Sequence, residues 1–234
     1  MNEFCDGLNV LELGSGSTAT SLVGMVLADA GARVIKIEQP GGDRLRTANP
    51  SGFLVWNRGK ESVVADLHTT EGQATVRSLA AAADVVIEGF APGTTTAWGI
   101  DGPALLAINP TLIHCSITAF GHDGPYRNIK GYDTLVAAKM GLSARGAFGH
   151  RDGAMLFPVP WASFGAGMQS VAGIMGALVV REKTGRGQLL NATLAAGLDP
   201  LDYFVATIVQ TWPSEAKRRT LTLGRSWLHR DTVC

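Results

Sequence analysis

Short apolar runs alternate with longer helical patterns along most of this chain. Segments such as LNVLEL, RVIKI and DVVIE are short and rich in β-branched residues, which is typical of buried strands. The stretches between them carry apolar positions at helical spacing or many small residues, and TTE at residues 69–71 is a helix start signal. The pattern predicts strands over residues 8–13, 33–37, 62–67, 84–88, 111–117 and 188–194, and helices over 20–30, 70–82 and 161–181.

Strands that alternate with helices at this spacing predict an α/β fold. We expect a Rossmann-like parallel sheet with helices on both faces and a long C-terminal helix. Crossovers between parallel strands are right-handed, and ligands of such sheets bind at the carboxyl ends of the strands. The loops after Leu13, Ile37, Glu88 and Ile117 should therefore gather at one edge of the sheet and form the binding site.

Composition and charge exclude several classes of function. Hydrophobic residues make up 46% of the chain, enough for a core, and its 20 basic and 20 acidic side chains cancel. Because a neutral chain offers no overall basic field, we expect no nucleic-acid partner. We also see no apolar window long enough for a membrane span and no signal-peptide layout at the start. The three scattered cysteines show no metal-ligand spacing, so we expect a cytoplasmic protein without a metal site.

A glycine loop follows the first predicted strand. Gly14 and Gly16 lie between that strand and the next helix, whose N-terminus would offer unpaired N–H groups to an anion. Glu38 ends the second strand, where a carboxylate could accept a hydrogen bond from a ribose hydroxyl. These features are compatible with a dinucleotide-binding enzyme, with a SAM-dependent methyltransferase, or with a tight turn that binds nothing.

A series of short motifs in the rest of the chain is more specific. Each motif alone is common, so the information lies in their order and spacing. They are, in chain order, NRGKES from Asn57, DL from Asp66, TEG from Thr70, ADVVIEGF from Ala83, PG from Pro92, WGI from Trp98, NP from Asn109, SITAFG from Ser116, GPY from Gly124, GYD from Gly131 and EKTGRGQ from Glu182.

This ordered series resembles the family III CoA-transferases, which include formyl-CoA and carnitine-CoA transferases and the 2-methylacyl-CoA racemases. The resemblance runs from about Asn9 to Asn191. It implies a homodimeric protein that binds a CoA thioester and a small carboxylic acid as substrates, with no covalently bound cofactor. It also implies a CoA site made by residues Ala65, Asp66, Gly89, Phe90, Thr94, Lys130 and Tyr132.

Several positions depart from the pattern of that family: Ala19-Thr20-Ser21 replaces its usual Ala-Gly-Pro, Tyr132 stands where the racemases place a histidine, and two further departures bear directly on the site. The aspartate that accepts the acyl group in the transferases lies at the start of the long helix, and Ser163 stands there in this chain. A serine cannot form an anhydride, and it needs a neighbouring base, for which we consider only His122 and His150. We expect Ser163 to cap the helix N-terminus. We also expect the chain to transfer no acyl group, because no carboxylate stands at residue 163. Ala97 replaces an arginine, so we expect CoA affinity to be weakened by roughly 1.5–3 kcal/mol.

The resemblance also suggests how the chain is divided. We expect residues 1–193 to form the large CoA-binding domain and residues 194–234 to form a linker helix and a polar tail leading toward a small domain that is absent. The apolar stretch 194–212 would then remain uncovered and promote self-association. An alternative is that the chain is the non-catalytic, CoA-binding half of a tandem protein.

Overall fold

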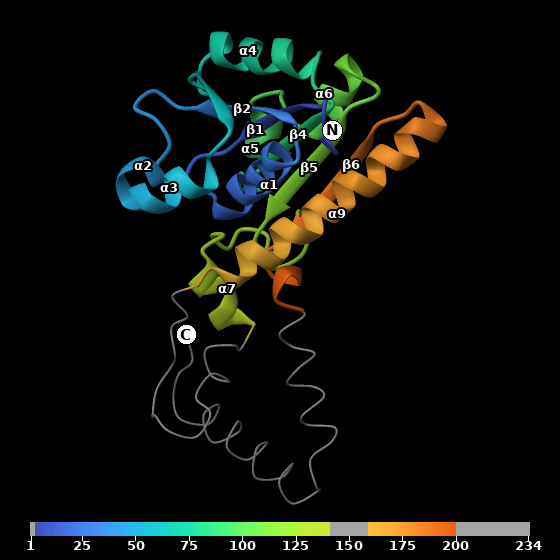
Figure 1. Cartoon of the computed structure of the whole chain (residues 1–234). Coiled ribbons are helices and arrows are strands. Elements are labelled where there is room, and N and C mark those ends of the chain that lie inside the picture. The colour runs from blue at the N-terminus through green and yellow to red at the C-terminus, as the bar shows by residue number, and fades with distance from the viewer. Residues whose placement is uncertain (1–2, 141–158, 200–234) are drawn as a thin grey trace, which may run out of the picture.

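The fold is a six-stranded parallel sheet, as the alternating pattern predicted. The computed structural model describes residues 3–140 and 159–199 of the chain (Figure 1). The strands lie in the order β3-β2-β1-β4-β5-β6, and every neighbouring pair is parallel. Their bounds are β1 (Asn9–Leu13), β2 (Arg33–Glu38), β3 (Lys60–Val64), β4 (Val85–Glu88), β5 (Ile113–Thr118) and β6 (Gln188–Thr193).

Helices cover both faces of this sheet, and the sheet separates two apolar cores. Successive residues of β1 point to opposite faces, so Val10 and Leu11 enter different cores. The long helix α9 packs beside α1 on one face, whereas α4 and α6 cover the other (Figure 1). The helices are α1 (Thr18–Asp29), α2 (Leu45–Ala48), α3 (Pro50–Trp56), α4 (Thr70–Ala80), α5 (Thr94–Ala97), α6 (Gly102–Ile108), α7 (Asp133–Lys139) and α9 (Trp161–Thr184), followed by the 3₁₀ turn η1 (Ala196–Leu198).

The predicted elements are all present, with boundaries displaced by a few residues. The largest displacement is in β3, which we placed at 62–67 but which spans Lys60–Val64. The polar residues Lys60 and Glu61 are typical of a loop. The side chain of Lys60 is nevertheless only 2% exposed, because it contacts Glu12. The short helices α2, α3, α5, α6 and α7 were not predicted, because none is long enough to show a helical period.

Helix α9 packs closely because small residues line its buried side. A Cβ at Gly165 would lie 1.9 Å from the carbonyl oxygen of Gly197, and one at Gly167 would lie 2.8 Å from Leu22. By length and composition alone α9 could cross a membrane. Its contacts with α1, β5 and β6 instead make it a core helix of this α/β domain.

Candidate functional site

The carboxyl edge of the sheet contains a cavity of about 520 Å³. Loops that follow β1, β2, β4 and β5 all contribute to it, as expected for a parallel sheet. The segment before α7 and the first turn of α9 close its other side. The lining residues used below are Gly16, Ser17, Arg44, Gly89, Phe90, Arg127, Lys130, Tyr132, Asp133 and Ser163.

The glycine loop brings the N-terminus of α1 to this cavity. Gly14 and Gly16 have φ values of 149° and 75°, which permit the turn between β1 and α1. Ser17 is the N-cap of α1, and its hydroxyl accepts a hydrogen bond from the backbone N–H of Thr20 at 3.3 Å. Because α1 runs for 12 residues, its N-terminal end presents a positive dipole to the cavity.

A buried network of charged side chains supports the glycine loop. The ammonium group of Lys36 lies 2.6 Å from Glu12 and 3.0 Å from Asp43. Asp43 in turn accepts a hydrogen bond from the backbone N–H of Gly16 at 3.1 Å. Burial alone would lower the pKa of Lys36, but Glu12 and Asp43 outweigh that effect and raise it. In Lys60, which also contacts Glu12 at 2.7 Å, burial prevails and lowers the pKa.

The hydrogen bonds of Glu38 argue against a dinucleotide site at the glycine loop. Its carboxylate accepts two hydrogen bonds from Arg46 and one from Ser62, each at 2.7 Å, and another from the backbone N–H of Asp43 at 2.7 Å. The Arg46 hydrogen bond is the main cause that lowers the pKa of Glu38 to about 2. With both oxygens engaged inside the protein, Glu38 is not placed to bind a ribose hydroxyl.

The loop after β4 approaches α1 too closely for any side chain at residue 89. A Cβ at Gly89 would lie 2.7 Å from the Cγ2 atom of Thr20. Phe90 follows, and it both lines the cavity and packs edge-on against Trp98, with ring centroids 5.2 Å apart. Phe90 is therefore a wall of the cavity and part of the adjoining core at once.

The turn at Gly89 and Phe90 is tied to a buried carboxylate. Glu88 accepts a hydrogen bond from the backbone N–H of Phe90 at 2.9 Å and another from the hydroxyl of Ser116. Burial raises the pKa of Glu88. His122 Nε2 lies 3.0 Å from the Ser116 hydroxyl. This histidine therefore supports the loop after β4, and no hydrogen bond links it to Ser163 in the part of the chain that the structure describes.

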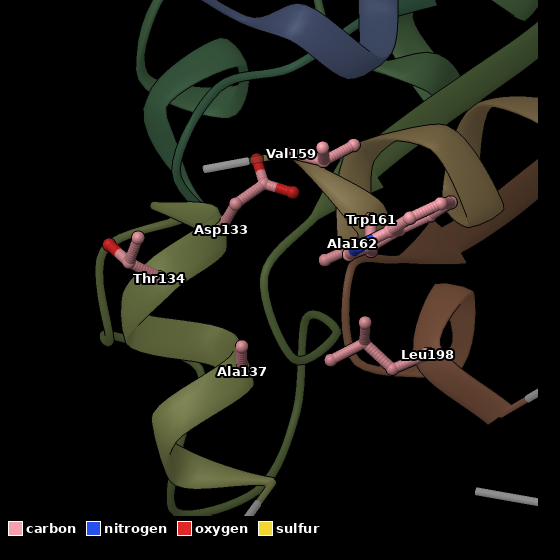
Figure 2. A pocket seen from close by; sticks show the side chains of 7 residues that line it. All are labelled: Asp133, Thr134, Ala137, Val159, Trp161, Ala162 and Leu198. Carbon is pink, nitrogen blue, oxygen red and sulfur yellow. The ribbon is translucent and has the colours of Figure 1, made fainter. Parts of the chain in front are cut away.

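Ser163 lines the cavity beside a carboxylate, Asp133, that was not predicted as a site residue. Its hydroxyl donates a hydrogen bond to Asp133 Oδ2 at 2.6 Å, and its backbone N–H donates to Oδ1 at 2.8 Å. Figure 2 shows Asp133 at the start of α7, near the beginning of α9 where Trp161 and Ala162 lie. The expectation that Ser163 caps α9 was wrong, since it is the third residue of that helix and Asp133 is the capping group.

The remaining predicted site residues divide into two groups. Gly89, Phe90, Lys130, Tyr132 and Ser163 line the cavity together, whereas Ala65, Asp66 and Thr94 do not line it. Ala65 and Asp66 follow β3, and the Asp66 carbonyl accepts hydrogen bonds from Thr69 in the turn into α4. Thr94 begins α5. His150 lies outside the described residues.

Two basic residues that line the cavity, Arg44 and Arg127, were not predicted from the sequence. Both are exposed and lie in loops, where a single sequence gives no sign that they face a cavity. Together with Lys130 they give the cavity three cationic side chains against one carboxylate, Asp133, among its described lining residues. Within residues 3–140 and 159–199, no cluster of His, Cys, Asp and Glu is placed to hold a metal ion.

Comparison with known proteins relates this chain to one family. The family described as CoA-transferase family III matches residues 5–220. The chain is 40% identical over 203 residues to a succinate–glutarate CoA-transferase of Agrobacterium fabrum, covering 80% of this chain and 50% of the relative. It is 32% identical over 222 residues to human succinyl-CoA:glutarate CoA-transferase, covering 91% of this chain and 50% of the relative.

A solved structure agrees with this relation. The structure described as a CAIB/BAIF family protein from Brucella suis superimposes with a TM-score of 0.82 at 39% sequence identity. That superposition covers 90% of this chain and 58% of the other. This chain thus spans about half the length of the enzymes that it resembles.

Proposed function

This chain belongs to CoA-transferase family III, and we propose that its cavity binds a CoA thioester. The observation that carries the proposal is the position and charge of the cavity. It lies at the carboxyl edge of the sheet, and its described lining carries Arg44, Arg127 and Lys130. CoA is a polyanion with a diphosphate and a 3′-phosphate, which cationic side chains and a helix N-terminus can hold.

The chemistry of the lining residues supports one orientation of the ligand. The nucleotide would lie against the wall formed by Gly89 and Phe90, where the aromatic ring offers a stacking face. The phosphates would lie near Lys130 and the N-terminus of α1. The thioester would then lie near Asp133 and Ser163, which also line the cavity.

We propose movement of CoA between carboxylic acids as the reaction class. The support is the resemblance to relatives whose names include succinate–glutarate and succinyl-CoA:glutarate CoA-transferase. Those names make dicarboxylic acids the first substrates to test. The second candidate, a CoA-binding half without activity of its own, is favoured by one observation, the serine at residue 163.

Isothermal titration calorimetry with CoA, NAD and SAM tests the binding proposal. We expect heat of binding with CoA and a weaker or absent response with the other two ligands. Lys130→Ala should weaken CoA binding by about 1.5 kcal/mol, roughly tenfold, because a charge-assisted phosphate contact is lost. Lys139→Ala is the matched control, since Lys139 contacts the ring of Tyr126 and does not line the cavity. Preferential binding of NAD or SAM would refute the proposal.

We also propose that the chain forms a homodimer. Val179, Val180 and Leu189 are 57%, 43% and 48% exposed along the C-terminal half of α9 and the edge strand β6. An apolar surface of this kind commonly finds a partner. Residues 200–212, the greater part of the segment expected to mediate self-association, lie outside the described residues. Sedimentation equilibrium should give a dimer at micromolar concentration, and a monomer there would contradict the proposal.

A further inference from the structure

Asp133 and Ser163 form a hydrogen-bonded pair in the lining of the cavity. Within the described part of the chain, Asp133 is the one carboxylate among the residues that line this cavity. Ser163 is 3% exposed, whereas Asp133 is half-buried. A molecule that enters the cavity can therefore reach the carboxylate of Asp133 more readily than the hydroxyl of Ser163.

We propose that Asp133 is the nucleophile that accepts the acyl group in this protein. The inference rests on the proposed function, because it needs a CoA thioester in the cavity. It assigns the covalent step to a carboxylate on α7, one hydrogen bond away from the serine on α9.

The reaction class favours a carboxylate over a hydroxyl. Moving CoA from one acid to another without hydrolysis requires an intermediate that stays as reactive as the thioester. An acyl group on a carboxylate is a mixed anhydride, which a thiolate or a second carboxylate can attack. An acyl group on Ser163 would be an ordinary ester, from which an incoming carboxylate would have to form an anhydride, and that step is strongly uphill.

The steps balance with no oxidant, reductant or further co-reactant. An oxygen of Asp133 attacks the thioester carbonyl carbon, the C–S bond breaks, and CoA leaves as the thiolate. The thiolate attacks the Cγ carbon of Asp133, and the first carboxylate leaves with the electron pair of the broken C–O bond. The acceptor carboxylate then attacks the aspartyl thioester and expels CoA thiolate. That thiolate attacks the acceptor's carbonyl carbon, which releases the new acyl-CoA and restores the Asp133 carboxylate.

The surroundings of Asp133 suit this task. Its carboxylate faces the N-terminus of α9, a helix of 24 residues, whose dipole stabilises a negative charge at that point. The hydrogen bonds from the backbone N–H and the hydroxyl of Ser163 fix the orientation of the carboxylate. Ser163 is thus a positioning residue. Its hydroxyl can donate a hydrogen bond to Asp133 whenever the carboxylate is charged, before acylation and after the acyl group has left.

Trapping with hydroxylamine and peptide mapping tests the assignment. The full chain is incubated with succinyl-CoA and hydroxylamine, which converts an aspartyl thioester into a hydroxamate on the side chain. Mass spectrometry should find the hydroxamate on the peptide that contains residue 133. Asp133→Asn should abolish it, and Ser163→Ala should leave a reduced amount at the same residue. Asp123→Asn is a matched control, since Asp123 does not line the cavity, and should change nothing.

Calorimetry with CoA on the same samples separates the two proposals. If CoA binds and the unmodified chain carries no hydroxamate on residue 133, Asp133 is not the nucleophile and the binding site stands. Stable acylation of Ser163 would overturn the assignment in favour of serine chemistry. If CoA does not bind, the proposed function itself fails. Because the first reading comes from the unmodified chain, the test does not depend on whether Asp133→Asn folds.

Discussion

Lys36 lies on β2 beneath the glycine loop, where 2% of its side chain is exposed. Its ammonium group contacts the carboxylates of Glu12 and Asp43, and it also donates a long hydrogen bond of 3.4 Å to the carbonyl oxygen of Gly14. Replacing Lys36 with methionine keeps most of the aliphatic volume and removes the charge. The change leaves two buried carboxylates with one cation fewer.

The magnitude follows from what remains around each carboxylate. Breaking a buried ion pair by removing one partner costs about 3–5 kcal/mol. Glu12 keeps Lys60 at 2.7 Å, and Asp43 keeps backbone N–H donors from Gly16 and Leu45. We therefore expect the lower end of the range, about 3 kcal/mol of lost unfolding free energy for Lys36→Met. Asp43 holds Gly16, so we also expect weaker CoA binding.

Urea unfolding followed by circular dichroism measures this loss. Arg33→Met is the matched control on the same strand, because Arg33 pairs with Glu61 while both side chains are more than half exposed. Solvent screens that pair, so its loss should matter far less. Adding Asp43→Asn to Lys36→Met should recover part of the stability, since one unpaired charge is then removed. If Lys36→Met loses no more stability than Arg33→Met, the network does not stabilise the loop as described.

Three further predictions concern stability. The pKa of Glu38 is about 2 in the folded protein, against an ordinary 4.5. The carboxylate therefore stabilises the fold fully above pH 4.5, and this stabilisation is lost as the pH falls toward 2. Glu38→Gln should remove that pH dependence from the urea midpoint. Burial lowers the pKa of His114 to about 4 from 6.5, so the unfolded chain binds its proton first; stability should fall between pH 6.5 and 4, and His114→Gln should flatten this window. Gly165→Ala should destabilise the protein by roughly 1–3 kcal/mol because its Cβ would meet Gly197, whereas Gly176→Ala, with open space at its Cβ, should raise the melting temperature by the equivalent of about 0.5–1 kcal/mol.

The hydrophobic pattern was sufficient to predict the sheet. Most residues of strands β1, β2, β4 and β5 are buried because helices cover both faces of the sheet, and each strand contains several apolar residues. That pattern also places the loops after them at one edge, where the cavity lies. The edge strand β3 was misplaced because Lys60 is buried by an ion pair with Glu12, which no local signal reveals.

The candidate site was only partly predictable. Motifs directly after strands, such as Gly89 and Phe90, were found because strand ends fix their place in space. The meeting of Asp133 with Ser163 depends on packing between α7 and α9, two elements separated by residues outside the described part of the chain. The GYD motif contained Asp133, but a single sequence does not show which carboxylate faces residue 163.

A crystal structure of this protein with bound CoA tests the central claim most directly. The account predicts density along the carboxyl edge of the sheet, with the nucleotide against Phe90, the phosphates near Lys130 and the N-terminus of α1, and the sulfur directed at Asp133. CoA bound outside this cavity, or bound within it with the sulfur directed away from Asp133 and Ser163, would contradict the account.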